Sequence, residues 1–198
     1  MPRKIDLYAR HKKEYVAPKS PVLVKVGPAR YLSIDGQGAP GGERFTAAIG
    51  ALYGAAFTIK MTRKFAGKQD YAVAKLEALW PGDLSLPRDQ WRWTLMIRTP
   101  AFVTAAELKK AIATLIERGK SSDVKAVKLR AIKEGQCVQM LHVGPYEAEG
   151  PAWDAMEDFA ESHRLSFAGS HHEIYLSDPR RVAPAKLKTI LRKPVKRS

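Results

Sequence analysis

The sequence predicts an α+β fold built from two copies of a β-α-β-β module related by pseudo-twofold symmetry. The first observation is the order of the expected elements, which runs β-α-β-β over about residues 22–98 and again over about residues 127–194. A helix expected at 104–118 links the two copies. We therefore place one folded domain at 21–195 and a basic, polar lead at 1–20.

The second and third observations are two short echoes between the halves. Leu95-Met-Ile-Arg-Thr-Pro100 ends the first copy, and Thr189-Ile-Leu-Arg-Lys-Pro194 ends the second. One element earlier, Leu76-Glu-Ala-Leu79 holds the place that His172-Glu-Ile-Tyr175 holds in the second copy. Self-similarity at this scale is typical of a duplicated module.

The first copy opens with alternating apolar residues, which predict a strand that begins at Val22 and continues to Asp35. Glycine and proline at 36–42 predict a loop. The next segment has an apolar stripe at helical spacing, formed by Phe45, Ile49, Leu52 and Ala56. Strands are then expected at 71–80 and 91–98.

The linking helix has a defined start. Thr104 can accept a hydrogen bond from a free helix amide while Glu107 reaches back to the main chain, which is the capping-box pattern. After it, 127–132 and 136–143 read as a pair of strands that turn near Glu134 and Gly135. The remaining elements are a helix at 151–164 and strands at 171–176 and 187–192.

The formal net charge of +14 is concentrated at the two ends. Residues 1–25 carry +5 and residues 179–198 carry +8, which leaves +1 for the residues between. This distribution predicts solubilising ends. The alternative is weak, non-specific and salt-dependent nucleic-acid binding through the ends.

The composition indicates a soluble cytoplasmic protein. No apolar run approaches the roughly 20 residues of a membrane span, and the start has no apolar segment typical of a secretory signal. Cys137 is the single cysteine, which suits a reducing compartment. The sequence leaves open whether the protein is a monomer or a homodimer.

Glu173 is the strongest candidate for chemistry. In a strand, His171, Glu173 and Tyr175 point to one face, and a carboxylate between an imidazole and a phenol can attract a cation or move a proton. Burial among aromatic rings would raise its pKa, which suits a general acid or base. The alternative is an exposed acid paired with one of the many basic residues.

Glu77 holds the echoing place in the first copy, so it is expected to approach a shared cleft from the opposite side. The alternative for Glu77 is a surface acid paired with Lys75 or Arg92. Flat walls for a planar ligand could come from five aromatic residues, of which we expect at least two to be core: Trp80, Trp91, Trp93, Tyr53 and Tyr146.

No metal or other cofactor is expected. His171 and His172 are sequential in a strand and point to opposite faces, and Cys137 lies on the opposite face of its strand from His142. The glycines at 36–38 lack the third glycine of a dinucleotide-binding fingerprint.

Several segments together resemble the GyrI-like family, and more narrowly its single-domain branch. They are 50–61, 76–80, 93–98, Leu141-His-Val-Gly-Pro-Tyr146 and His171-His-Glu-Ile-Tyr-Leu-Ser-Asp-Pro179. The resemblance covers about residues 20–195. The sequence has no N-terminal helix-turn-helix, so the transcription-activator role of some relatives is not expected.

The resemblance implies a GyrI-like, SOUL-type fold whose two modules enclose a ligand cleft, with Glu173 as the pocket carboxylate and His171 beside the ligand. Relatives bind aromatic, often cationic drugs, some are similar to hydrolases that open strained cyclopropanes, and a haem-binding family shares the fold. Fold alone does not decide among these. Three functions stay open: a binding module, a hydrolase using Glu173 with Tyr175 or Glu77, and a basic nucleic-acid-associated or gyrase-modulating protein.

Overall fold

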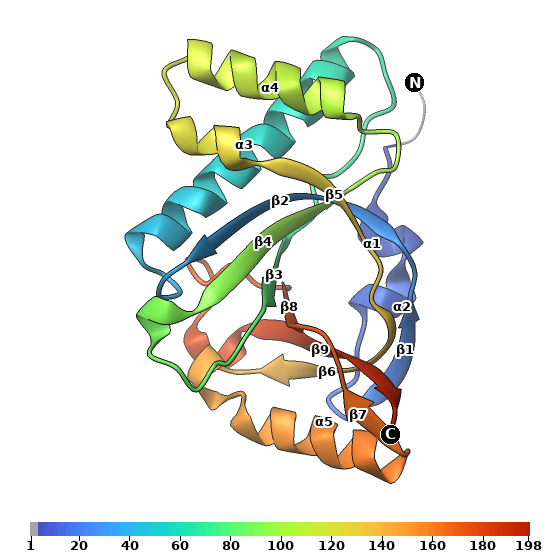
Figure 1. Cartoon of the computed structure of the whole chain (residues 1–198). Coiled ribbons are helices and arrows are strands. Elements are labelled where there is room, and N and C mark those ends of the chain that lie inside the picture. The colour runs from blue at the N-terminus through green and yellow to red at the C-terminus, as the bar shows by residue number, and fades with distance from the viewer. Residues whose placement is uncertain (1–3) are drawn as a thin grey trace. The chain divides into compact units, whose positions relative to one another are not determined.

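The structure is a computed structural model that describes residues 4–198, and it is mixed α+β (Figure 1). Contacts within the chain divide it into two units. Among the described residues, unit 1 comprises 4–10 and 29–132, and unit 2 comprises 11–28 and 133–198. No helix in the described part of the chain is both long enough and apolar enough to cross a membrane.

Unit 1 contains an antiparallel sheet in the strand order β3-β4-β2-β5. The bounds are β2 (Ala29–Gln37), β3 (Leu76–Trp80), β4 (Arg92–Thr99), β5 (Lys128–Ile132), α1 (Leu7–Arg10), α3 (Glu43–Phe65) and α4 (Ala105–Glu117). Helix α3 packs against β2 and β4, and α4 packs against α3 (Figure 1). The predicted apolar stripe of α3 buries Phe45, Leu52 and Ala56.

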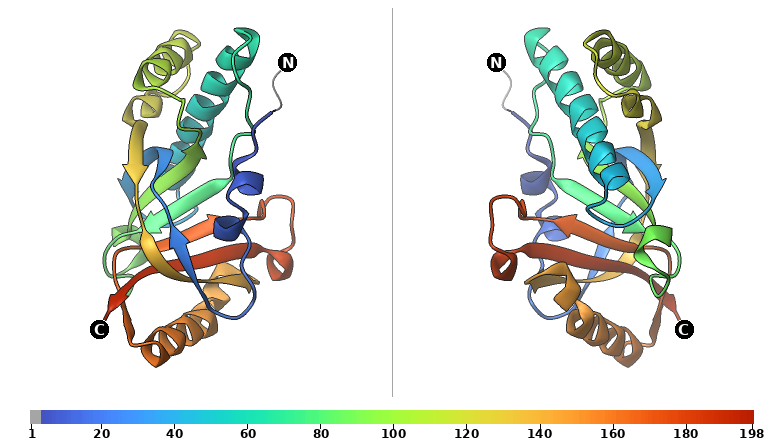
Figure 2. Two further views of the ribbon diagram at one scale, coloured as in Figure 1. Left: turned by 90° about the vertical axis from the view of Figure 1, so that its right-hand side faces the viewer. Right: turned by 90° about the vertical axis from the view of Figure 1, so that its left-hand side faces the viewer.

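Unit 2 contains an antiparallel sheet in the strand order β1-β6-β9-β8, and β7 also pairs with β9. The bounds are β1 (Val22–Val26), β6 (Gly135–Val143), β7 (Leu165–Phe167), β8 (His171–Tyr175), β9 (Lys188–Arg197), α2 (Lys12–Tyr15) and α5 (Gly150–Ser162). Helix α5 packs on β6 and β7 (Figure 2). Its buried residue Met156 joins Val138, Met140 and Leu191 in the core.

Short 3₁₀ helices complete the chain at Arg88–Gln90, Ser122–Ala126, Tyr146–Ala148 and Pro184–Lys186. Each unit contains one strand-helix-strand-strand set, β2-α3-β3-β4 in unit 1 and β6-α5-β8-β9 in unit 2, where the short strand β7 lies between α5 and β8. In each set the first strand pairs with the last strand, as the predicted module order suggests. The pseudo-twofold relation between the sets stays a prediction.

The structure corrects the predicted boundaries of the modules. The strand predicted from Val22 to Asp35 is two strands, because Gly27 and Pro28 interrupt it and proline has no N–H for a ladder. Strand β1 pairs with β6 of unit 2, and β5 pairs with β2 of unit 1 rather than with β6. The predicted modules at 22–98 and 127–194 therefore exchange their first strands. The strand predicted at 71–80 begins only at Leu76.

The predicted separate lead at 1–20 is also corrected for its described part; residues 1–3 lie outside the described residues. Ile5 and Leu7 are buried in unit 1, and Tyr15 and Ala17 are buried in unit 2. The main-chain N–H of Leu141 donates to the Pro18 carbonyl at 2.7 Å. Apolar residues at intervals in this basic segment therefore attach it to the fold.

The structure contains the capping box that the sequence predicts at the start of α4. Thr104 accepts from the Glu107 N–H at 3.2 Å, and the Glu107 carboxylate accepts from the Thr104 N–H at 2.9 Å. The capping box is thus confirmed, and α4 begins at Ala105 as expected.

Candidate functional site

Strand β8 places the predicted carboxylate, phenol and imidazole on one face, as strand alternation requires. The Tyr175 hydroxyl donates to Glu173 Oε2 at 2.6 Å. His171 Nε2 lies 3.3 Å from Glu173 Oε1. The predicted juxtaposition of these three side chains is confirmed, and the alternative of an exposed Glu173 is wrong because the residue is 8% exposed.

Glu149, which the sequence reasoning missed, completes the cluster. It is the N-cap residue of α5 and is buried. One side-chain ligand atom each from Glu149, His171 and Glu173 lies within 4.8 Å of the other two. An acid directly before the helix-starting Gly150-Pro151 was the available signal, because carboxylates favour helix N-termini.

The protonation state of Glu149 follows from its burial beside Glu173. Burial and then the charge of Glu173 raise the pKa of Glu149 to about 9, although a hydrogen bond from Trp153 lowers it. Glu149 is therefore protonated at neutral pH. Since the Tyr175 hydroxyl already donates to Glu173, we assign the negative charge to Glu173.

His171 is a neutral imidazole in this setting. Burial and then the charges of Lys193 and His172 lower its pKa to about 3, so its contact with Glu173 is not an ion pair. The His171 ring packs against Trp153 of α5 with centroids 4.1 Å apart. Neither His171 Nε2 nor Glu149 Oε1 has a hydrogen-bond partner, although both atoms are buried. Two polar atoms in the cluster can therefore take a partner from a ligand.

Aromatic rings border the cluster on two sides. Tyr146 meets Tyr175 edge to face, with ring centroids 5.7 Å apart. Burial and then the charge of Glu173 raise the pKa of Tyr146 to about 12, and the pKa of Tyr175 lies well above its ordinary value for the same reasons. Both phenols are therefore neutral hydrogen-bond donors at neutral pH. Tyr146 was predicted for the site, whereas Trp153 was not.

The other predicted aromatic residues lie in unit 1. Trp80 and Trp93 are buried against Phe45 of α3, with ring centroids 6.0 and 5.4 Å from it. Trp91 meets Trp80 edge to face and donates its indole N–H to the Leu86 carbonyl. Tyr53 stacks on Phe57. Trp80 and Trp93 are thus core residues of unit 1, as we expected for at least two of the five.

Glu77 is fully buried on β3, so its predicted alternative as a surface acid is wrong. Its charge helps burial raise the pKa of Tyr8 far above the ordinary value. The predicted correspondence with Glu173 is wrong by one residue. Glu77 lies opposite Met96, whereas Glu173 lies opposite Leu191, and the echoed segments align Met96 with Ile190. Glu173 therefore corresponds to Leu76, and a role for Glu77 in a shared cleft stays a prediction.

Of the histidines His142, His171 and His172, His171 lies in a group of possible metal ligands, with Glu149 and Glu173. Within the described residues, this is the group of three whose spacing could hold a metal ion. His142 instead has Nε2 3.1 Å from the Pro145 carbonyl, and His172 contacts Glu134.

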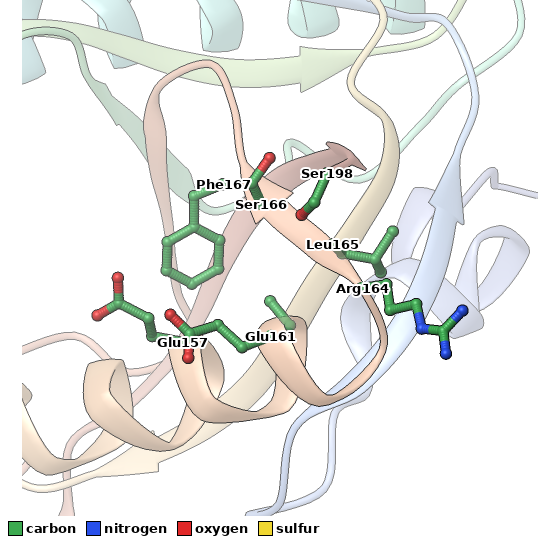
Figure 3. Close-up of a pocket in the computed structure, with 8 residues that line it drawn as sticks. Glu157, Glu161, Arg164, Leu165, Ser166, Phe167 and Ser198 are labelled. Carbon is green, nitrogen blue, oxygen red and sulfur yellow. The ribbon is translucent and has the colours of Figure 1, made fainter.

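Figure 3 shows a surface pocket of about 400 Å³ between the end of α5 and β7. Glu157, Glu161 and Phe167 are among its lining residues. Phe167 meets Trp153 edge to face with ring centroids 6.3 Å apart, and Trp153 in turn packs against His171, so two aromatic rings connect this pocket to His171.

The chain is similar to known proteins in both sequence and fold. The profile of the family described as GyrI-like small molecule binding domain matches residues 93–196. An uncharacterized conserved protein from Listeria innocua is 40% identical, with 98% of this chain and 100% of that chain covered and a TM-score of 0.91. A hydrolase from Listeria innocua is 39% identical, with the same coverage and a TM-score of 0.90. The comparison with curated proteins gives no match.

Proposed function

Because the chain belongs to the family of GyrI-like small molecule binding domains, we propose that the Glu149–Glu173 cluster binds a flat aromatic molecule and hydrolyses an electrophilic ring in it. The observation that carries the proposal is the pair of buried carboxyl groups, Glu149 with a raised pKa and Glu173 accepting from Tyr175, beside an imidazole and two phenols. Two such groups can divide the roles of acid and base. The likeness to a hydrolase at 39% identity supports hydrolysis over binding alone.

The substrate class is an aromatic compound with a cyclopropane conjugated to a carbonyl group. Glu173 Oε1 takes a proton from water, and the water oxygen forms a bond to a ring carbon. The strained carbon–carbon bond breaks, and its electron pair moves into the conjugated carbonyl. Glu149 donates its proton to that oxygen, so the substrate gains one water molecule. The proton that Glu173 took from water then passes to Glu149, which restores both groups for the next turnover.

Each neighbouring group has a part in this scheme. The Tyr175 hydroxyl donates to Glu173 Oε2, and His171 Nε2 lies 3.3 Å from Oε1, so both groups fix the orientation of the carboxylate toward a bound water. Trp153 and Tyr146 offer ring faces or edges to the flat ligand. The unpartnered His171 Nε2 can hydrogen-bond a polar group of the ligand.

A binding module without catalysis is the second candidate. The ionised Glu173 beside aromatic rings also suits a cationic aromatic molecule, which a carboxylate would hold through charge and the rings through stacking. This candidate requires no proton transfer. Loss of the charge on Glu173 should therefore lower turnover if the protein is a hydrolase, and lower only the affinity for cationic ligands if it is a binding module.

Glu173→Gln separates the two candidates, because it keeps the volume of the side chain and removes its charge and basicity. Hydrolysis requires turnover of a cyclopropane-bearing alkylator to fall by about 100-fold or more while the neutral substrate still binds. Simple binding requires loss of about 1–3 kcal/mol of affinity for cationic aromatic dyes and no turnover in either protein.

The matched control is Glu157→Gln, which removes an exposed carboxylate from α5 of the same unit. Affinity is followed by quenching of tryptophan fluorescence and turnover by product analysis. If Glu173→Gln behaves like Glu157→Gln in both measurements, the site proposed here is wrong.

A further inference from the structure

A buried polar network lies on the face of β8 opposite Glu173, which we call the back face. Arg192 of β9 is fully buried, and its Nε donates to Gln139 Oε1 at 3.0 Å. Its Nη1 donates to Glu134 Oε2 at 2.9 Å, and its Nη2 donates to the Glu14 carbonyl. The other Glu134 oxygen lies 2.9 Å from Nδ1 of His172, which is 1% exposed.

The network follows the strand register across three strands. His172 of β8 lies opposite Arg192 of β9, and Arg192 lies opposite Gln139 of β6. Glu134 precedes β6 directly and joins the two ends of this row. The Gln139 amide also donates to the Lys13 carbonyl at 3.3 Å, so the segment before β1 is held by the same row.

Stability alone is a weak reason for such an arrangement. Burial by itself would raise the pKa of Glu134, yet His172 and Arg192 lower it to about 2. Buried ion pairs recover little more than their cost of desolvation, and apolar replacements are often as stable. A buried polar network can instead select one arrangement of the chain among several.

We infer that Glu134, His172 and Arg192 are positioning residues that set the register of β8 and thereby hold Glu173 toward Glu149. The inference rests on the proposed function. Successive residues of a strand point to opposite faces, so a slip of one residue turns every side chain over. His172 is adjacent to both His171 and Glu173 and is the residue of β8 that the network binds.

The two possible slips show what the network prevents. One slip would bring Glu173 to the position of His172, where two carboxylates, Glu173 and Glu134, would meet. The other slip would bring Glu173 to the position of Ile174, which is fully buried on the back face. Either position buries an uncompensated charge, which is strongly unfavourable.

The test compares three substitutions on the back face of β8. His172→Leu removes the partner of Glu134 and leaves the Arg192–Glu134 contact in place, so the fold is retained. His172→Gln keeps a side chain that can donate to Glu134. Ile174→Val is the control, because it weakens packing at a neighbouring back-face position outside the network.

We expect His172→Leu to lower kcat for the cyclopropane-bearing alkylator by about 10–100-fold with little change in KM, because misplaced groups lose rate before affinity. His172→Gln should recover kcat to within about threefold of the wild type. Ile174→Val should lower the melting temperature with kcat nearly unchanged. Equal kcat values in His172→Leu and Ile174→Val at equal stability would overturn the inference.

A second readout does not depend on turnover. The chain has five histidines, so ¹H–¹⁵N spectra of histidine-labelled protein resolve each ring. His172→Leu should shift or broaden the His171 signal, because β8 is no longer held at position 172, whereas Ile174→Val should leave it unchanged. A single unchanged His171 signal in His172→Leu overturns the inference. Failure of the proposed function would be recognised separately, because neither Glu173→Gln nor Glu149→Gln would then change turnover.

Discussion

Glu149→Gln should make the protein more stable and at the same time inactive. The amide has nearly the shape of the protonated acid, so it removes the proton that Glu149 donates and leaves the packing unchanged. We expect turnover of the cyclopropane-bearing alkylator to fall by about 100-fold, the usual share of one general acid. Affinity for a neutral aromatic ligand should change less than about twofold.

The gain in stability follows from the raised pKa. An ordinary Glu ionises near pH 4.5, whereas Glu149 in the folded protein ionises near pH 9. Between these values the folded state holds a proton that the unfolded chain releases, so stability falls as the pH rises from 4.5 to 9. Each pH unit contributes about 1.4 kcal/mol, so the loss at pH 7 is about 3 kcal/mol. The amide introduced by Glu149→Gln has no proton to release, and the variant should be more stable by about 2–3 kcal/mol at pH 7.

The assay is urea unfolding of both proteins at pH 4.5, 7 and 9, with turnover measured on the same samples. The free energies of unfolding should agree at pH 4.5 and diverge as the pH rises, and Glu157→Gln should show no such divergence. A Glu149→Gln protein that is less stable than the wild type at pH 7, or a difference that does not grow with pH, would refute the reasoning. Turnover in the wild type should also decline above about pH 9, where Glu149 loses its proton.

Three further predictions concern the rest of the chain. Removal of residues 1–19 should lower the melting temperature by at least several degrees and weaken ligand binding. The reason is that Tyr15 and Ala17 are buried and that main-chain oxygens of this segment accept hydrogen bonds from Arg192 and Gln139. Calorimetry measures the first effect and fluorescence titration the second. Gly36→Ala should destabilise unit 1 by about 1–3 kcal/mol, since the added Cβ would lie 2.1 Å from the Trp93 ring, and urea unfolding followed by tryptophan fluorescence measures it. DNA binding should be weak and fall steeply between 50 and 200 mM salt, as for contacts with phosphates alone; binding that persists at high salt would favour a nucleic-acid function.

The helix cap and the face of strand β8 that carries Glu173 could be predicted from the sequence. The capping box at Thr104 depends on residues three positions apart, and strand alternation alone puts His171, Glu173 and Tyr175 on one face. The fold class and the family likewise follow from patterns that a single chain displays. These features need no knowledge of which distant segments meet.

Strand partners required the tertiary structure. Alternation identifies the strand at Val22 and the strand at 127–132, but both edges of a strand offer the same hydrogen-bonding groups, so the pattern does not name the neighbour. Because β1 pairs with β6 and β5 pairs with β2, β1 belongs to unit 2 and β5 to unit 1, contrary to the predicted modules. For the same reason, the predicted correspondence between Glu77 and Glu173 was wrong by one residue. The register of a strand depends on its partner strand, which one segment of sequence does not reveal.

By itself, the sequence determined the fold class, the linking helix and the face of β8 that carries Glu173. Only the tertiary structure decided that Glu149 meets Glu173, that Arg192 is buried, and that the basic N-terminal segment is part of the fold. Helix capping and strand alternation depend on residues that are close in the sequence, so the order of the residues is enough to predict them. Burial and pKa depend instead on groups that folding brings together, such as Arg192 and the carbonyl of Glu14 at the other end of the chain, and desolvation there sets the charge of each group.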